Sequence, residues 1–229
     1  MAHPLIHLGY AYELSSRTLS IEALAMVSCF YNKQHKYLDD PTYTKPSPFS
    51  STSPIKILER LAEDDRFDGM FETEGEDNVL AVSEDEKKET LMLEYWNALH
   101  IDDPKTQFQD CQRAAAGLLI GTKKSDNQQY DFFIVHSLTS SHALRILLPV
   151  IPAKWHVSLL RQWWLFVVTA YIGQLRPRFD LKRIEDYDRE GKEWKWVDYR
   201  AVNGKWATDA HFVKGKSSGS AAHAPIGEV

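Results

Sequence analysis

The stretch WWLFVVTAYIG, at residues 163–173, is the most apolar run of the chain and decides the fold class. Its length of about eleven residues falls well short of the roughly 20 that a membrane-spanning helix needs. We therefore predict a core helix. Helical periodicity extends this helix over Lys154–Gln174, and Pro152 and Pro177 mark its two ends.

Helical periodicity continues through most of the chain, whereas the alternation typical of strands is scarce. The expected fold class is therefore all-α, an irregular multi-helix domain with long connecting loops. One helical domain is expected over residues 1–214, and the Gly-, Ser- and Ala-rich residues 215–229 predict a disordered tail. The other predicted helices are Pro4–Glu13, Leu19–Tyr31, Pro54–Ala62, a helix that contains Leu91–Leu99 and ends near Asp102–Pro104, Thr106–Ile120 and Tyr130–Leu148.

Two sets of side chains are expected to be buried. Leu19, Ala23, Met26 and Phe30 form one stripe of a predicted helix, which is typical of a core-facing surface. The two cysteines, Cys29 and Cys111, are too few for a disulfide framework, so we expect free buried thiols in a reducing compartment, the cytoplasm.

The segment Asn32–Ser53 is expected to be irregular, and either exposed or draped over the mouth of a cavity. Prolines at positions 41, 46 and 48 exclude a continuous helix. Loops of this length are often active-site lids. The acidic stretch Glu63–Glu89 that follows is expected to be a solvated face.

The overall charge argues against polyanionic partners. The chain has 229 residues, 43% of them hydrophobic, which is enough to bury a core. Its formal net charge is −5 and its isoelectric point is near 6.0. We therefore expect no nucleic-acid partner and no membrane partner. The first residues show no secretory signal.

Nine histidines supply the candidates for metal chemistry. His3 and His7 stand four residues apart on a predicted helix, so they face the same side, as two ligands of one ion would; capping or surface roles are the alternative. His136 lies among apolar residues and is expected either as a core histidine with both nitrogens satisfied or as a ligand. His142 falls on a different helical face from His136.

No other catalytic motif competes with these histidines. The sequence has no phosphate-binding glycine loop, no dinucleotide fingerprint, no serine elbow and no HExxH motif. Aromatic residues are instead concentrated in the core helix. Most of them are expected in the core, and a minority could line a pocket for a flat aromatic ligand. The aromatic residues concerned are Trp155, Trp163, Trp164, Phe166 and Tyr171.

Several blocks of the chain resemble the questin oxidase-like family. The first is HPLIHLGYAYE at residues 3–13, followed by IEALA at residues 21–25. The next blocks are DFFIVHSLTSS at residues 131–141 and Leu159–Arg161 leading to Tyr171 and Pro177. A weaker block, DAHFVK at residues 209–214, resembles an element near the end of the family pattern.

The resemblance implies an oxygenase of secondary metabolism that cleaves a ring of an anthraquinone-like aromatic polyketide in Baeyer–Villiger fashion. It implies a histidine-bound non-haem iron and NADPH as co-substrate. Carried over by motif, the ligand candidates are His7 and His136, then His3 and His211, with Lys214 as a ligand or charge partner. We expect His7 and His136 to face one cavity.

The family pattern extends upstream of the first block, where it carries a further histidine cluster. The resemblance therefore covers its C-terminal part, and we expect an incomplete ligand set that binds iron weakly. Two hypotheses remain open at this stage: part of an iron-dependent oxygenase, whose other helices come from elsewhere, or an inactive scaffold that keeps a ligand pocket. Uncovered apolar faces would make the chain a homo-oligomer or a partner of the missing N-terminal half.

Overall fold

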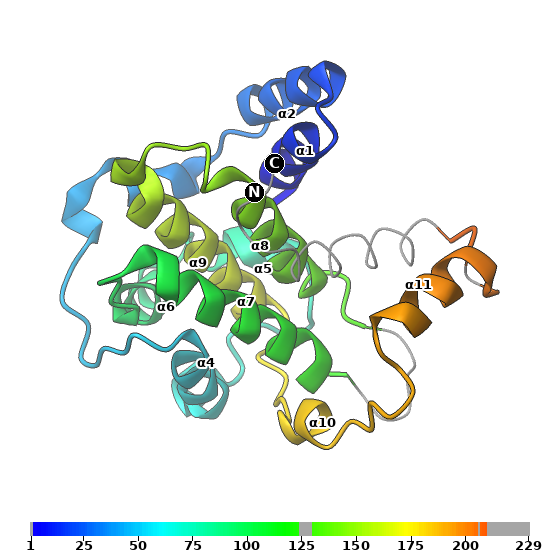
Figure 1. Cartoon of the computed structure of the whole chain (residues 1–229). Coiled ribbons are helices and arrows are strands. Elements are labelled where there is room, and N and C mark those ends of the chain that lie inside the picture. Colours follow the sequence, from blue (N-terminus) through cyan, green and yellow to red (C-terminus); the bar gives the residue numbers. More distant parts are fainter. Residues whose placement is uncertain (1, 124–129, 206, 210–229) are drawn as a thin grey trace. The chain divides into compact units, whose positions relative to one another are not determined.

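A computed structural model describes residues 2–123, 130–205 and 207–209, and these residues form an all-α protein with no strand (Figure 1). The chain divides into two compact units, Met1–Ile184 and Glu185–Val229. The α-helices are α1 Ala2–Glu13, α2 Arg17–Cys29, α3 Lys36–Asp39, α4 Pro54–Glu63, α5 Asp77–Ala81, α6 Glu86–Ala98, α7 Pro104–Gly121, α8 Val135–Leu147, α9 His156–Gly173, α10 Lys182–Glu185 and α11 Trp194–Asn203.

Helix α9 is the centre of the first unit, and α5, α6, α7 and α8 pack around it (Figure 1). Trp163 and Trp164 are buried, and each indole N–H reaches a backbone carbonyl of a neighbouring helix. Trp163 Nε1 donates to Ser137 O of α8 at 3.1 Å, and Trp164 Nε1 donates to Tyr95 O of α6 at 3.2 Å. The predicted core helix is thus confirmed, with its polar indole atoms satisfied.

Helices α1 and α2 form a pair that contacts the rest of the unit mainly through α8 (Figure 1). Ser16 caps α2, since its Oγ accepts from Leu19 N at 3.4 Å. The predicted core stripe of α2 is wrong: only Ala23 is buried, and Phe30 is 62% exposed. Helix α2 packs mainly on α1, and its outer face is exposed at Ile21, Leu24 and Val27. The same placement leaves Cys29 exposed, contrary to expectation, whereas Cys111 is buried as expected.

The start of α8 differs from the sequence prediction. The helix begins at Val135 instead of Tyr130, because Asp131 forms a turn before it. Asp131 Oδ1 accepts from the backbone N–H groups of Phe133 and Ile134, both at 2.8 Å. Helices α5, α10 and α11 were not predicted, and α6 ends at Ala98, before the predicted end near Asp102. In the second unit, α11 buries Ala201.

The segment Asn32–Ser53 has no long helix, as its prolines predicted. It contains one turn of α-helix, α3, flanked by the short 3-10 helices Lys33–His35 and Pro41–Tyr43. Two buried side chains anchor it to the unit: Gln34 Nε2 donates to Val79 O at 2.6 Å, and Tyr37 Oη donates to Glu89 Oε1 at 2.6 Å. From Pro41 to Ser50 the segment runs along a cavity.

No helix within residues 2–123, 130–205 and 207–209 has both the length and the apolar character needed to cross a bilayer. The core helix α9 is enclosed by other helices of its own unit instead.

Helices α1 and α8 approach so closely that Gly9 has no room for a side chain. A Cβ at Gly9 would lie 2.6 Å from both Cα and Cβ of Ala143. We expect Gly9→Ala to lower the free energy of unfolding by about 1–3 kcal/mol, because the two backbones would have to separate. Urea denaturation would measure the change. Gly75→Ala is the matched control, since its Cβ would meet nothing within 4 Å. Equal effects of the two substitutions would show that the close approach does not stabilise the pair.

Candidate functional site

Two of the predicted ligands, His3 of α1 and His136 of α8, are in direct contact. Their Nε2 atoms lie 3.1 Å apart, and the rings meet edge to face with centroids 4.8 Å apart. The packing of α1 on α8 around Gly9 brings the two residues together from distant parts of the sequence. Two nitrogens that share one ion, each at about 2.1 Å, must lie within about 4.2 Å of each other. The pair satisfies this requirement.

The hydrogen bonds of His136 determine its tautomer. Its Nδ1 lies 2.7 Å from the carbonyl oxygen of Phe132, and a carbonyl only accepts, so Nδ1 carries the proton. In the neutral ring Nε2 is then the acceptor, and His3 Nε2–H donates to it. A backbone carbonyl that holds Nδ1–H is the usual partner of a histidine that binds a metal through Nε2.

The surroundings of His3 keep its ring neutral near pH 7. Its pKa lies below the usual 6.5, mainly because burial penalises the charged form, and also because His136 and His7 are nearby. The negative charge of Glu76 raises the pKa of His3, but its effect is smaller. A neutral imidazole keeps the lone pair that a metal ligand must offer.

His7, on the same helix, faces the carboxylate of Glu22 on α2. The distance from His7 Nδ1 to Glu22 Oε1 is 3.5 Å, which is long for a hydrogen bond, and Nδ1 is a buried atom without a hydrogen-bond partner among the described residues. In the part of the chain that the structure describes, no group of three or more His, Cys, Asp or Glu residues is arranged to hold one metal ion. His211 and Lys214 lie outside the described residues.

The most buried imidazole of α8 is His142, whereas His136, expected among core residues, is only half-buried. His142 Nε2 lies 3.0 Å from Glu13 Oε2, and Arg145 Nη2 lies 3.0 Å from His142 Nδ1. Because a guanidinium only donates, His142 Nδ1 is unprotonated and Nε2–H donates to Glu13. His142 therefore links α1 to α8 through a chain of hydrogen bonds. The sequence placed it on a different helical face from His136, yet both histidines contact α1.

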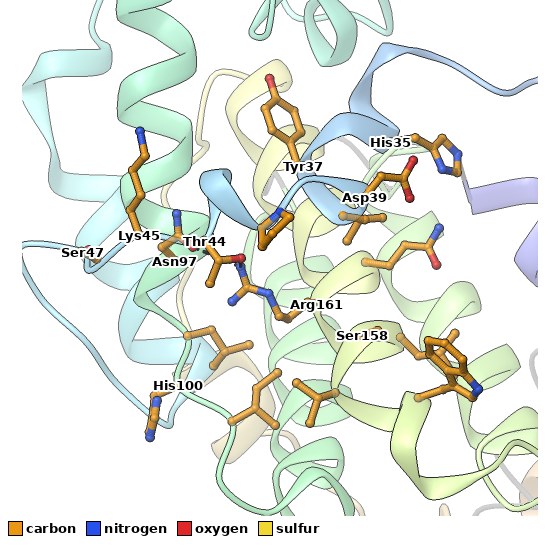
Figure 2. Close-up of a pocket in the computed structure, with 18 of the residues that line it drawn as sticks. His35, Tyr37, Asp39, Thr44, Lys45, Ser47, Asn97, His100, Ser158 and Arg161 are labelled. Atoms are coloured by element: carbon orange, nitrogen blue, oxygen red, sulfur yellow. Dashed lines mark hydrogen bonds between the residues drawn. The ribbon is translucent and has the colours of Figure 1, made fainter.

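A cavity of about 1150 Å³ opens elsewhere in the first unit, between the 35–50 segment, the end of α6 and the start of α9 (Figure 2). It is somewhat larger than the 300–1,000 Å³ typical of ligand sites. Tyr37, Leu99, Ile101 and Trp155 contribute apolar and aromatic surface. None of His3, His7 and His136 is among its lining residues.

Arg161 of α9 is the central polar group of this cavity. Figure 2 shows its side chain reaching toward Thr44 and Asn97. Its Nη2 donates to Asn97 Oδ1 at 3.0 Å and to Thr44 Oγ1 at 3.4 Å, and its Cζ lies 4.0 Å from the centre of the Trp96 ring. Burial lowers the pKa of the guanidinium from its ordinary value. No carboxylate among the described residues forms an ion pair with it.

Sequence reasoning did not single out Arg161, although it lies in the block Leu159–Arg161. The available signal in the sequence was a positively charged residue two positions before the apolar run at residues 163–173. The expectation that a minority of the aromatic residues line a pocket is met by Trp155, which is 52% exposed beside the cavity. Trp163, Trp164 and Tyr171 are buried in the core.

The family model described as questin oxidase-like matches residues 1–215. No curated protein and no solved structure matches the chain.

The lowered pKa of His3 has a consequence for stability. Above about pH 6.5 the ring is neutral in both the folded and the unfolded chain; as the pH falls through 6.5 toward the lower folded pKa, the unfolded chain binds the proton more readily. Acidification therefore destabilises the folded state. We expect His3→Gln to reduce the fall in melting temperature between pH 7.5 and pH 5.5 relative to wild type, because glutamine does not titrate. An unchanged pH profile in His3→Gln would contradict the assignment.

Proposed function

The chain belongs to the questin oxidase-like family, and from this premise we propose that it cleaves a ring of an anthraquinone-like polyketide in an oxygen-dependent, Baeyer–Villiger-type oxidation. Family membership indicates an oxidoreductase of the oxygenase kind in a polyketide context. The substrate class, the iron and the co-substrate NADPH belong to the proposal.

The proposed reaction balances with O₂ and NADPH. One oxygen atom enters the carbon–carbon bond beside a ring carbonyl and gives a lactone, which opens on hydrolysis. The other oxygen atom leaves as water, with two electrons and a proton from NADPH and a second proton from solvent.

The observation that carries the proposal is the contact between His3 and His136. The two Nε2 atoms lie 3.1 Å apart, and the Phe132 carbonyl holds His136 in the tautomer that leaves its Nε2 unprotonated. His3 Nε2 carries the proton of the hydrogen bond between them, so His3 would have to move this proton to Nδ1 before both Nε2 atoms could bind one ion. Imidazole is a suitable ligand for non-haem iron. Bound there, Fe²⁺ would supply the activation of O₂, for which no side chain offers a substitute.

The chain's own contribution is to hold this pair in place. Gly9 against Ala143 sets the distance between α1 and α8, and the Glu13–His142–Arg145 chain links the same two helices at their other end. The buried Nδ1 of His7, without a hydrogen bond among the described residues, leaves one more imidazole on α1 with an unused polar atom.

The test is an anaerobic Fe²⁺ titration followed by oxygen uptake with a hydroxylated anthraquinone and NADPH. We expect weak but saturable binding of one Fe²⁺ ion per chain, because the described residues contain no group of three ligands for one ion. Binding should weaken about tenfold or more in His3→Ala and in His136→Ala, because each substitution removes a ligand. Oxygen uptake should fall in parallel. His100→Ala, with a side chain that is 66% exposed, is the matched control for Fe²⁺ binding only, because His100 lines the cavity around Arg161.

Binding of Fe²⁺ with equal affinity by wild type, His3→Ala and His136→Ala would exclude this pair as the iron site. Oxygen uptake that persists in the double variant would exclude the pair from the reaction.

A further inference from the structure

The cavity around Arg161 has a charge opposite to that of the whole chain. The formal net charge of the chain is −5, yet the cavity is lined by the cations Lys45 and Arg161 and by a single acidic residue, Asp39, among its described lining residues. Asp39 Oδ2 already accepts a hydrogen bond from Tyr31 Oη at 2.9 Å. A lining of this kind attracts an anion against the overall field of the protein.

Arg161 is held in a fixed position with part of its donor capacity unused. Trp96 supports one face of the guanidinium, and the Trp96 indole N–H donates to Arg161 O at 3.0 Å, which ties α6 to α9 at this point. Asn97 is fixed as well, because its Nδ2 donates to Tyr43 O at 3.0 Å while its Oδ1 accepts from Arg161. Within the described part of the chain the hydrogen-bond partners of Arg161 are neutral and bind only Nη2, so Nε and Nη1 remain for a ligand.

A guanidinium that is partly removed from water without a carboxylate partner is costly for the protein. An ionised oxygen group of a ligand would offset this cost through charge-assisted hydrogen bonds, which are planar and often bidentate for arginine. The fall in the pKa of Arg161 on burial agrees with such an uncompensated site.

The remaining cavity wall suits a flat ring system. Trp155 lines the cavity and is 52% exposed, with the ammonium of Lys154 at 5.2 Å from the ring centre. Leu99, Ile101 and Val157 add apolar surface. Aromatic rings stack favourably on an exposed indole.

We propose that this cavity binds a planar aromatic anion, a carboxylate or phenolate, whose charged oxygen pairs with Arg161 while its ring system lies against Trp155. The identity of the ring system as anthraquinone-like rests on the proposed function; the anion site itself rests on the cavity.

The test compares two probes of nearly equal shape, anthraquinone-2-carboxylate and anthraquinone-2-carboxamide. Binding to the full chain is measured by calorimetry and by quenching of tryptophan fluorescence, without iron and without O₂. We expect the carboxylate to bind about 10- to 100-fold more tightly than the carboxamide, the range for a hydrogen bond to a charged group. Arg161→Gln should abolish this preference and leave carboxamide binding unchanged, and Arg161→Lys should retain part of it.

Arg113→Gln is the matched control for charge. It removes one positive charge from an exposed position on α7, where the side chain is 77% exposed, so the preference should persist. Melting temperatures of all variants show whether they remain folded, and Arg161→Lys keeps the test informative where Arg161→Gln fails to fold.

Three results would overturn the anion site: a carboxylate preference that persists in a folded Arg161→Gln, equal loss of both probes in Arg161→Lys, or no binding of either probe. Tighter Arg161-dependent binding of NADPH than of the carboxylate would also overturn it, in favour of the co-substrate. The probe-binding test is carried out without iron and O₂, so it is independent of the oxygen-uptake assay. Intact probe binding together with no oxygen uptake in that separate assay would contradict only the proposed reaction.

Discussion

The burial of α9 against its neighbours is the constraint on which the rest of the first unit depends. Three indole N–H groups reach backbone carbonyls across helix boundaries: Trp163 to α8, Trp164 to α6 and Trp96 of α6 back to Arg161 of α9. An indole buried without a partner would cost free energy, so each of these bonds also fixes the register of two helices. Helix α9 therefore positions both places where ligands are proposed to bind.

The histidine pair depends on this arrangement indirectly. Helix α8 is fixed to α9, and α1 follows α8 because Gly9 lets the two backbones approach. His136 lies in the first turn of α8 and His3 in the first turn of α1, so their contact at 3.1 Å joins two helix beginnings. A small displacement of α1 relative to α8 would therefore break the contact between the two Nε2 atoms.

The cavity depends on α9 directly, because Arg161 lies in its second turn and stacks on Trp96. The segment Asn32–Ser53 completes the cavity, and its anchors Gln34 and Tyr37 are hydrogen-bonded to positions far away in the sequence. Its prolines keep it from forming a long helix, so its residues from Pro41 to Ser50 can follow the cavity wall. The irregular backbone of this segment thus forms one wall of the cavity.

The sequence by itself determined the all-α class, the core helix, the irregular 32–53 segment and the family, because helical periodicity, proline positions and family motifs are local properties of the chain. Burial on α2 and the start of α8 were mispredicted: an apolar stripe does not say whether a partner covers it, and the turn at Asp131 competes with the helix. Only the tertiary structure decided that His3 meets His136, that His142 is the buried imidazole, and that Arg161 stands in a cavity without a carboxylate partner among the described residues. These features depend on contacts between residues 64 to 133 positions apart in the chain, and no local pattern specifies which distant residues will share a site.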